Sequence, residues 1–387
     1  MMTTEAAFIA GAYEHPGRDL PDTSMTQIHA EVAIGALADA GLTLADVDGY
    51  ICGTNAPGFG ALSMTDYLGL HPSYVDTTEA GGASYMVYVG HAASAIAAGK
   101  CQVVLITLAG RPRQELGGGF RLWPDAPEYS FEDLYGISTP TTYALAAQRH
   151  MYEFGTTSEQ LAMVKVTASQ HAQYNPNAFL RKPTTVEQVL ASPMISDPLH
   201  RDDCCVITDG GGALVVVSSD VARSLERHCV KIMGQGEAIK HPEAGGIDLT
   251  YTGAVWSGPR AFAEAGVTVG DIDYASIYDS FTITVVETIE DLGFCKKGDG
   301  GPFVASQALS APDGIIPFNT DGGGLCNNHP GNRGGMTKVI EAVRQLRGEA
   351  NPEVQVPDCE IALAHGTGGS LGTRMGSSTL ILGRQDA

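Results

Sequence analysis

The feature that most restricts how this sequence can fold is an internal repeat. Residues 38–52 read ADAGLTLADVDGYIC, and residues 263–277, which lie 225 positions later, read AEAGVTVGDIDYASI. The positions of the first copy that recur unchanged are Ala38, Ala40, Gly41, Thr43, Asp46 and Asp48. Self-similarity at a fixed offset indicates two copies of one structural unit. The repeat therefore predicts two similar halves related by a pseudo-twofold axis; chance similarity between unrelated strand–helix units is the alternative.

Both copies carry the signals of a helix, a short acidic turn and a strand. The helix expected over 26–40 ends at Gly41, and its counterpart in the second copy ends at Gly266. Glycine at that position suits a left-handed helix cap. In each copy the strand is followed by a loop, at 53–60 in the first half and at 278–281 in the second. Such loops are places where functional residues can lie.

The two halves also match beyond the repeat. The matching segments are Gly-Gly pairs at 81–82 and 334–335, helices over 84–98 and 336–347, and strands over 102–108 and 360–364. Each half is expected to close with a glycine-rich turn and a β-rich run, over 209–218 and 366–383. Strands that alternate with helices predict parallel sheets covered by helices on both faces.

We expect an N-terminal half over 1–222, a C-terminal half over 223–387, and an insert over about 110–198 within the first half. Loops this long are uncommon in a compact domain unless they carry function. The insert is therefore interpreted as a lid that also contacts a second subunit. A purely structural arm is the alternative.

Composition excludes several classes of function. The 387 residues include 44 acidic and 23 basic ones, a net charge of −21, which repels phosphate backbones and argues against nucleic-acid binding. Only 17 % are charged, against ~25 % in an average soluble domain, which suggests that another chain covers part of the surface. No apolar run approaches the ~18 residues of a membrane helix, and no secretion signal opens the chain.

Eight cysteines are scattered along the sequence, and none of them forms a Cys-x-x-Cys pair. This pattern supports neither a zinc site nor a disulfide framework. Each cysteine is interpreted as a small buried hydrophobic residue. We therefore expect a protein of the reducing cytoplasm.

Residues suited to acid–base chemistry lie in one glycine-rich loop and after two strands of the second half. The loop 322–335 reads GGGLCNNHPGNRGG and places Cys326 and His329 ahead of a helix. Backbone N–H groups in such a loop suit a developing negative charge. His365 opens the run HGTGG directly after an expected strand, and Tyr278 follows the strand of the repeat. The ends of parallel strands are where α/β sites collect.

The order and spacing of these segments resemble the thiolase superfamily, and particularly its sterol-carrier-protein-type branch. The matching segments are YDSF at 278–281 with the acidic run up to Gly293, NHP at 328–330, HGTGG at 365–369 and DGGGALV at 209–215. The resemblance covers essentially the whole chain. It implies an α/β thiolase fold in which two pseudo-symmetric βαβ halves form five αβαβα layers, with the insert as a loop or lid region.

The resemblance also implies roles for individual residues. His329 matches the histidine of the family's Gly-His-Pro loop, and His365 matches the residue that is cysteine in ordinary thiolases and histidine in this branch. Asp279 lies where thiolases carry the asparagine of their Asn-Glu-Ala-Phe loop. Backbone N–H groups near Gly82 and Gly368 would form an oxyanion hole.

One departure from the family decides the expected chemistry. Thiolases place a nucleophilic cysteine at the start of the first-half helix, but residues 79–85 read EAGGASY and put Gly82 at that position. Glycine has no side chain on which an acyl group could be carried. Ser84, which matches a small serine of the family, lacks a clear neighbouring base.

The remaining groups suffice for retro-aldol cleavage of a β-hydroxyacyl-CoA, because that reaction needs a base, an acid and enolate stabilisation but no acyl-enzyme. The resemblance supports this hypothesis, since side-chain-cleaving aldolases belong to the family. His329, His365 and Tyr278 are the candidate bases and acids, with Asp279 beside them. Two alternatives stay open: a Claisen-type acyltransferase that uses Cys326 as substitute nucleophile on a β-ketoacyl-CoA, and a non-catalytic acyl-CoA-binding scaffold.

Expectations about ligands and partners follow. The candidate substrate-binding residues are Ser84, Asn328, Arg181 and Lys182, the last two together with Arg111 and Arg113 as contacts of the CoA phosphates. Coenzyme A is expected as part of the substrate, with no separate cofactor and no metal. The resemblance further implies a homodimer formed through the first-half sheet. It also implies a small acyl-CoA-binding subunit with an OB-fold and a zinc ribbon. Steroid, aromatic and short acyl groups all remain compatible.

Overall fold

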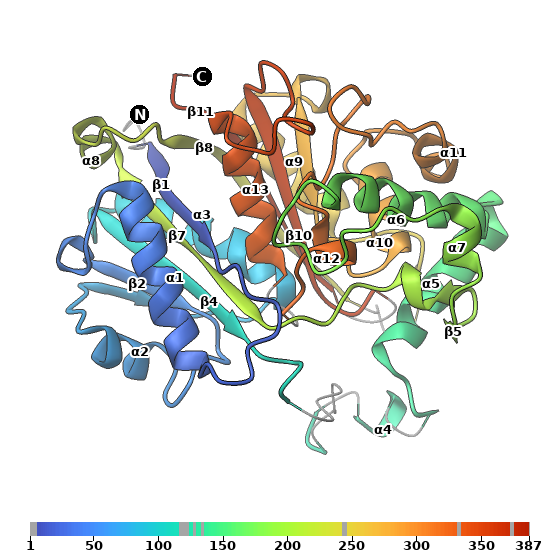
Figure 1. Cartoon of the computed structure of the whole chain (residues 1–387), viewed down its shortest axis with the longest axis horizontal. Helices are drawn as coiled ribbons and strands as arrows, with labels where there is room; N and C mark the ends of the chain where they lie inside the picture. The colour runs from blue at the N-terminus through green and yellow to red at the C-terminus, as the bar shows by residue number, and fades with distance from the viewer. Residues whose placement is uncertain are drawn as a thin grey trace.

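The structure is a computed structural model that describes residues 6–115, 124–126, 129–132, 135–241, 246–330, 334–371 and 375–386. Its centre is a nine-stranded sheet (Figure 1). In spatial order the strands are β3 (Tyr74–Asp76), β2 (Gly49–Cys52), β4 (Val103–Gly110), β7 (Gly210–Ser218), β1 (Ala7–Glu14), β8 (Val230–Lys240), β11 (Met375–Arg384), β10 (Ile361–Gly369) and β9 (Tyr274–Ile277). The two halves of the sheet meet where β1 pairs with β8.

Helices cover the sheet on both outer faces and fill the space between its halves. The first-half outer helices are α1 (Met25–Ala40) and α2 (Ala61–Leu68), the central pair is α3 (Ser84–Ala97) and α13 (Gly335–Arg347), and the second-half outer helices are α9 (Ala254–Ala265) and α10 (Thr282–Asp291). Alternate residues of β4 pack on different layers, Leu105 with α1 and Ile106 with the central pair. The five expected αβαβα layers are therefore present, and Figure 1 shows α13 between the two halves.

The sheet is mixed, which corrects the expectation of parallel sheets. Strand β2 is parallel to β3 and β4, and β9 is parallel to β10, but every other pair is antiparallel. The expected glycine-rich turns are also absent from their predicted places, because Gly210 begins β7 and β10 continues through Gly369. Strands such as β10 and β11, which are joined without a crossover helix, pair antiparallel.

The repeat forms the same local structure in both halves. Gly41 and Gly266 end α1 and α9 in the left-handed conformation, with φ of 72° and 71°. The turns that follow are 3-10 helices, Leu44–Asp46 and Val269–Asp271, each begun by a threonine–aspartate capping box. These matching caps confirm that the repeat forms the same helix end and turn twice.

The same hydrogen-bond pattern connects each copy of the repeat to a neighbouring strand. The carboxylate of Asp48 accepts the N–H of Val103, where β4 begins, at 2.8 Å. In the second half the carboxylate of Asp273 accepts the N–H of Ile361, where β10 begins, at 2.9 Å. The identical aspartates of the repeat therefore position the strands that lead toward the candidate site.

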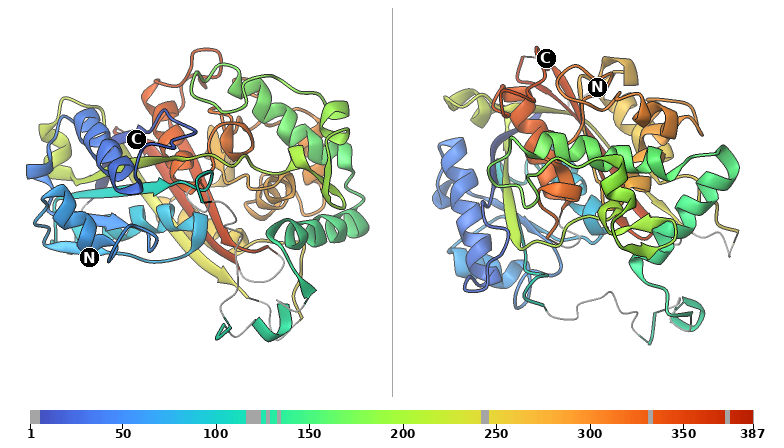
Figure 2. Two further views of the ribbon diagram at one scale, coloured as in Figure 1. Left: turned by 60° about the horizontal axis from the view of Figure 1, so that its bottom comes forward. Right: turned by 45° about the vertical axis from the view of Figure 1, so that its right-hand side comes forward.

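The insert packs on the second half of the molecule. Its elements are α4 (Tyr129–Glu132), α5 (Thr139–Phe154), α6 (Ser158–Ala172), α7 (Val186–Leu190) and the hairpin β5–β6 (Met194–Ser196 and Leu199–His200). Helix α6 contacts α10, α11 (Gly300–Ala305) and α12 (Gly323–Cys326), and the green helices lie against the orange ones in Figures 1 and 2. Residues 116–123 of the insert lie outside the described ranges.

Between β7 and β8 lies α8 (Ser219–Ser224), in which the expected boundary between the halves at 222/223 falls. In the described ranges, no helix has both the length and the apolar character needed to cross a bilayer.

Candidate functional site

Two residues from different loops of the second half form the centre of the candidate site. Tyr278 directly follows β9, and His329 follows α12. The Tyr278 hydroxyl and the His329 Nε2 atom share a hydrogen bond of 2.8 Å, and the two rings meet edge to face with centroids 5.4 Å apart. The structure therefore brings together two of the predicted acid–base residues, which are 51 positions apart in the sequence.

The Tyr278 ring lies directly against Gly82. A β-carbon on residue 82 would come within 2.4 Å of the Tyr278 Cε2 atom and within 2.5 Å of the Thr367 carbonyl oxygen. Real contacts are never that short, because atoms in a packed interior do not overlap. Residue 82 must therefore be glycine in this arrangement, and no nucleophilic side chain can extend from it.

The turn that contains Gly82 also packs against the backbone of β10. A β-carbon on Gly368 would lie 1.8 Å from the Ala80 carbonyl oxygen, and one on Gly81 would lie 2.6 Å from the Gly368 Cα atom. Gly81 in addition has a φ of 58°, which glycine adopts without strain. The structure therefore brings the backbones near Gly82 and Gly368, the expected oxyanion donors, into direct contact.

The imidazole of His329 is held in a tight and weakly hydrated setting. A β-carbon on Gly334 would lie 2.8 Å from the His329 Cδ2 atom, and one on Gly324 would lie 3.2 Å from it. Burial lowers the pKa of His329 to about 4, although the nearby Asp279 carboxylate opposes this shift. At neutral pH the ring is therefore uncharged and can accept a proton.

Asp279 is bound to backbone and side-chain groups next to the Tyr278–His329 pair. Its carboxylate accepts the N–H groups of Gly324 at 2.8 Å and Leu325 at 3.0 Å, and it forms an ion pair of 2.9 Å with Lys338. Both members of the ion pair are buried. Because these contacts occupy both carboxylate oxygens, Asp279 is arranged to hold α12 in place and not to exchange protons with a substrate.

Asn328, an expected substrate-binding residue, lies beneath the site. Its side chain is fully buried, donates to the Glu14 carboxylate at 2.9 Å and accepts the Thr208 hydroxyl at 2.7 Å. The structure corrects the expectation, because both ends of this amide are bound within the protein. Glu14 and Thr208 were not found by sequence reasoning, since nothing local to either marks them.

The position of His365 is a second correction. Its side chain is buried on the face of β10 that packs on α9, where Nδ1 bonds to the Thr379 hydroxyl at 2.9 Å. The same Thr379 hydroxyl is 2.9 Å from Ser257 of α9. On the opposite face, a β-carbon on Gly366 would lie 3.1 Å from the Gly82 carbonyl oxygen. Gly366, not His365, therefore faces the turn that contains Gly82.

Burial also keeps the His365 imidazole uncharged. It lowers the pKa of the imidazole to about 3, and the Nε2 atom finds no hydrogen-bond partner among the described residues. His365 is therefore a neutral core residue, and its recorded hydrogen bond to Tyr278 is made by the main chain: the His365 carbonyl accepts the Tyr278 N–H at 2.9 Å.

Cys326 lies in the core, packed with residues of α6 such as Ala168 and Ala172. The side chain is fully buried. Burial raises the pKa of its thiol, and Lys165 opposes that shift only in part. Because the thiolate is the nucleophilic form, these surroundings argue against Cys326 as a substitute nucleophile.

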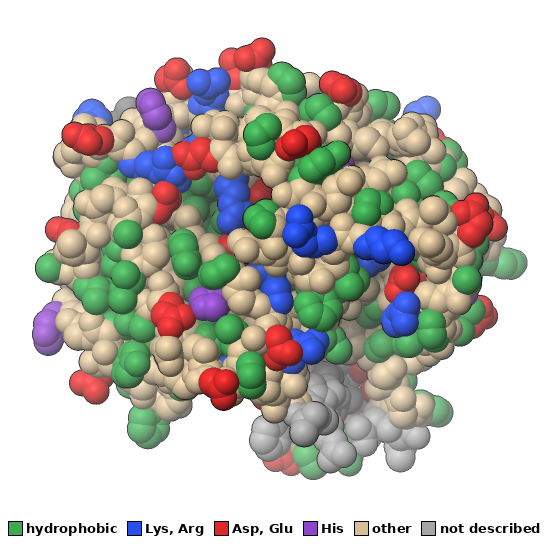
Figure 3. Space-filling view, in the orientation of Figure 1, with side chains coloured by type: hydrophobic (Ala, Val, Ile, Leu, Met, Phe, Trp, Pro, Cys, Tyr) green, Lys and Arg blue, Asp and Glu red, His purple; other side chains and the backbone are tan. Residues whose placement is uncertain are grey.

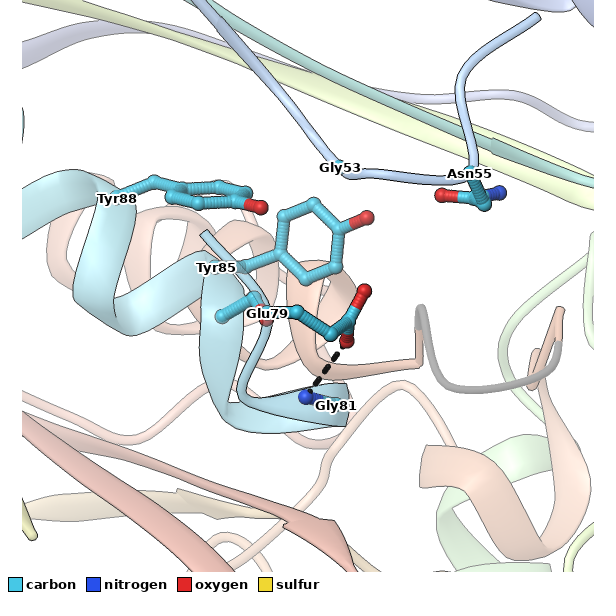
Figure 4. A pocket seen from close by; sticks show the side chains of 7 residues that line it. Gly53, Asn55, Glu79, Gly81, Tyr85 and Tyr88 are labelled. Carbon is cyan, nitrogen blue, oxygen red and sulfur yellow. Dashed lines mark hydrogen bonds between the residues drawn. The ribbon is translucent and has the colours of Figure 1, made fainter. Parts of the chain in front are cut away.

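Ser84 has a structural partner of its own. Its hydroxyl accepts the Ala80 N–H at 2.9 Å and so closes the turn before α3. Ser84 also lines a shallow depression, together with Gly53, Asn55, Glu79, Gly81, Tyr85 and Tyr88. Figure 4 shows Glu79 below Tyr85, with its carboxylate accepting the Gly81 N–H at 2.8 Å. This depression adjoins the turn that contains Gly82.

The basic residues expected to contact CoA differ in availability. Arg113 is paired with Asp19 at 3.2 Å, and Arg111 donates to two backbone carbonyls. Arg181 and Lys182 are exposed, and Arg181 makes one backbone contact. Figure 3, drawn in the orientation of Figure 1, shows Lys and Arg side chains interspersed with acidic ones over the face in view. Arg181 and Lys182 are therefore better placed than Arg111 and Arg113 to meet a phosphate.

Comparison with a family model and with known proteins shows which proteins this chain is similar to. Residues 236–384 match the family model described as thiolase C-terminal domain-like. The chain is 34 % identical to an acetyl-CoA acetyltransferase of Methanothermobacter thermautotrophicus, over 92 % of this chain and 94 % of that protein. It is also 34 % identical to the 17-hydroxy-3-oxo-4-pregnene-20-carboxyl-CoA lyase of Mycobacterium tuberculosis, over 93 % of this chain and 94 % of that protein.

Among solved structures, the chain is similar to one titled Ltp2-ChsH2(DUF35) aldolase. The TM-score is 0.88, the sequence identity is 32 %, and the match covers 98 % of both chains. The similarity therefore extends over both halves and the insert, and includes the loops that hold Tyr278 and His329.

Proposed function

Since this chain belongs to the thiolase superfamily and its full-length relatives are named as enzymes, we propose that it cleaves a β-hydroxyacyl-CoA by a retro-aldol reaction. The products would be a shorter acyl-CoA and a ketone or aldehyde. CoA enters as part of the substrate, and the proposed reaction needs no other cofactor.

One observation carries this proposal: the nucleophile position is Gly82, and the Tyr278 ring fills the space where a side chain would extend. A Claisen-type transferase carries its acyl group on a nucleophile during the reaction. A retro-aldol reaction transfers no acyl group to the protein, so it loses nothing when that position is glycine. The lyase and aldolase names of two relatives support the same choice.

The proposed step balances in protons and electrons. A base takes the proton of the β-hydroxyl group, the Cα–Cβ bond breaks, and its electron pair moves onto the thioester as an enolate. Protonation of Cα then releases the shorter acyl-CoA. The Tyr278–His329 pair would accept the first proton and return one to Cα, because the imidazole is neutral at pH 7. Backbone N–H groups near Gly82 and Gly368 would stabilise the enolate oxygen.

A transferase activity is the second candidate, and the name of the Methanothermobacter relative favours it. It would require a nucleophile other than residue 82. Cys326 was the expected substitute, and its burial and raised thiol pKa count against it.

The two activities are separated by one pair of assays. The protein is incubated either with a β-hydroxyacyl-CoA or with a β-ketoacyl-CoA plus free CoA, and the products are followed by mass spectrometry. We expect release of a carbonyl compound from the first substrate without consumption of CoA. Thiolysis of the second substrate, lost in Cys326→Ala, would instead establish the transferase.

The similar solved structure also bears on partners, because its name places ChsH2(DUF35) beside the aldolase. We propose that this chain forms a homodimer and joins a small acyl-CoA-binding subunit with an OB-fold and a zinc ribbon. We further propose a cytoplasmic location, since all eight cysteines are free thiols. Co-expression with such a subunit, followed by size-exclusion chromatography, tests the complex; elution of the two chains apart would contradict it.

A further inference from the structure

The segment 205–209, which precedes β7, runs between the two loops of the candidate site and bonds to both. The Cys205 N–H donates to the Ser280 carbonyl at 2.9 Å, next to Tyr278 and Asp279. The Val206 N–H donates to the Gly324 carbonyl at 2.9 Å, within α12. This first-half segment therefore holds together two loops of the second half.

Thr208 makes the contact that reaches His329. Its hydroxyl accepts the His329 N–H at 2.8 Å and donates to the Asn328 amide oxygen at 2.7 Å. Thr208 is fully buried, so water does not compete for either bond. Thr208 therefore holds the main chain of His329 through its N–H, while the imidazole of His329 bonds to the Tyr278 hydroxyl.

A charged residue anchors this chain of hydrogen bonds. The Asn328 amide nitrogen donates to the Glu14 carboxylate at 2.9 Å, and Arg18 donates to the same carboxylate at 2.8 Å. Burial would raise the pKa of Glu14, but Arg18 and Arg344 outweigh it and lower the pKa. Glu14 is therefore an ionised acceptor, which fixes the Asn328 amide with its oxygen toward Thr208.

We propose that Thr208 is a positioning residue: its hydroxyl, oriented by Asn328 and Glu14, fixes the main chain of His329 and with it the contact between the imidazole and Tyr278. The proposal rests on the proposed function in one respect, that the Tyr278–His329 pair acts on the substrate. A displacement of about 1 Å at a reacting group can cost about 100-fold in rate.

Three variants test this proposal. Thr208→Val keeps the shape of the side chain and removes the hydroxyl, and Thr208→Ser keeps the hydroxyl. Thr107→Val is the matched control, because Thr107 is equally buried and its hydroxyl also has two partners, His29 and Tyr50, on the face of β4 that packs on α1. If Thr208→Val does not fold, Thr208→Cys replaces it, since a thiol is a weaker partner of similar size.

The kinetic readout is carbonyl release from a β-hydroxyacyl-CoA. We expect Thr208→Val to lower kcat about 100-fold with little change in KM, Thr208→Ser to restore most of the rate, and Thr107→Val to stay within about threefold of the wild type. A Thr208→Val enzyme as active as Thr107→Val would overturn the proposal.

A second readout does not depend on activity. The imidazole of His329 is titrated by NMR, and its midpoint in the wild type is expected at about 4. In Thr208→Val a loosened and hydrated loop should move the midpoint toward 6.5, while Asp279 and Lys338 stay in place. An unchanged midpoint would contradict the positioning role. If the wild type released no carbonyl product, the proposed function would fail, and this titration would still decide the role of Thr208.

Discussion

The ring of Tyr278 occupies the space that a β-carbon on Gly82 would need, with Cε2 only 2.4 Å from that point. The two residues are therefore sterically coupled: the Tyr278 ring in this position requires glycine at 82. A nucleophile at 82 would require a smaller residue at 278 and also a shift of the Thr367 carbonyl oxygen, which lies 2.5 Å from the same point. A side chain at residue 82 and the Tyr278 ring in its present position exclude each other.

Restoring the cysteine alone should consequently not restore a thiolase. We expect Gly82→Cys to lose about 1–3 kcal/mol of stability through overpacking and to form no acyl-enzyme, as seen by intact-protein mass spectrometry. Gly270→Cys is the control, since a β-carbon there meets only Thr268, at 3.8 Å. Combining Gly82→Cys with Tyr278→Gly removes the ring but leaves the Thr367 carbonyl oxygen 2.5 Å from the new β-carbon, so the thiol also needs that backbone to shift. Acylation of the single variant Gly82→Cys would show that the Tyr278 ring moves aside.

The Tyr278 hydroxyl should matter for turnover more than for folding. Tyr278→Phe keeps the ring that packs on Gly82 and removes the hydroxyl that bonds to His329. Proton transfer by a positioned group contributes about 100-fold or more, so we expect kcat for carbonyl release to fall by at least that factor. Tyr50→Phe removes a buried hydroxyl that bonds to Thr107 and should leave kcat nearly unchanged. Equal rates in the two variants would contradict the role of Tyr278.

His365 should prove dispensable for chemistry, contrary to the role implied by the family resemblance. His365→Leu fills a similar volume on the face of β10 that packs on α9 and removes an Nε2 atom without a partner in the described residues. We expect kcat within about threefold of the wild type, whereas His329→Asn should lose about 100-fold. A large loss in a folded His365→Leu protein, judged by circular dichroism, would place His365 back in the reaction.

Glu287 should make stability fall as pH rises. Burial, followed by the charge of Asp291, raises its pKa well above 4.5, and neither carboxylate oxygen has a hydrogen-bond partner among the described residues. The folded state therefore keeps a proton that the unfolded state releases above pH 4.5, so stability from this group is lost as pH rises toward the folded pKa. Glu287→Gln should gain Tm relative to the wild type between pH 5 and pH 8.

The neighbouring Glu290 provides the opposite case for comparison. Burial alone would raise its pKa, but the bonds to His150 and Lys297 lower it below 4.5. Glu290→Gln should therefore lose Tm relative to the wild type, and lose more at pH 8 than at pH 4. A Tm difference for Glu287→Gln that does not change with pH would show that Glu287 is ionised in the folded protein.

The buried ion pair below the site should be costly to break on one side. Lys338→Met leaves the Asp279 carboxylate buried without its cation, which destabilises by about 3–5 kcal/mol in comparable cases. Adding Asp279→Asn should recover part of this loss, because the amide is neutral. The exposed Lys296→Met is the control. Chemical denaturation measures all three, and no recovery in the double variant would argue that Asp279 needs its charge for the N–H groups of α12.

Several features of the fold and site could be predicted because their signals are local. The repeat fixes helix caps at Gly41 and Gly266 and the aspartates that begin β4 and β10. Tyr278 and His329 were found because each lies in a marked loop. The prediction that all strands run parallel was wrong, since periodicity within a strand does not distinguish parallel from antiparallel pairing.

Sequence periodicity alone also explains why the side chain of His365 was expected to face the candidate site. Side chains alternate between the two faces of a strand, so the face of any residue depends on where β10 runs and on what covers it. The sequence ended this strand at 364, whereas the structure continues it to Gly369 and turns Gly366 toward Gly82. A shift of one position thus separates a candidate catalytic histidine from a core residue.

The sequence by itself therefore determined two matching halves, their caps, and a glycine at the position where a nucleophile is expected. Only the tertiary structure decided which groups meet at that glycine. Tyr278, His329 and Thr208 come from segments far apart in the chain. Their contacts form only when both halves pack against the central helices α3 and α13. Local sequence patterns encode elements, whereas contacts between elements form only when the core is assembled.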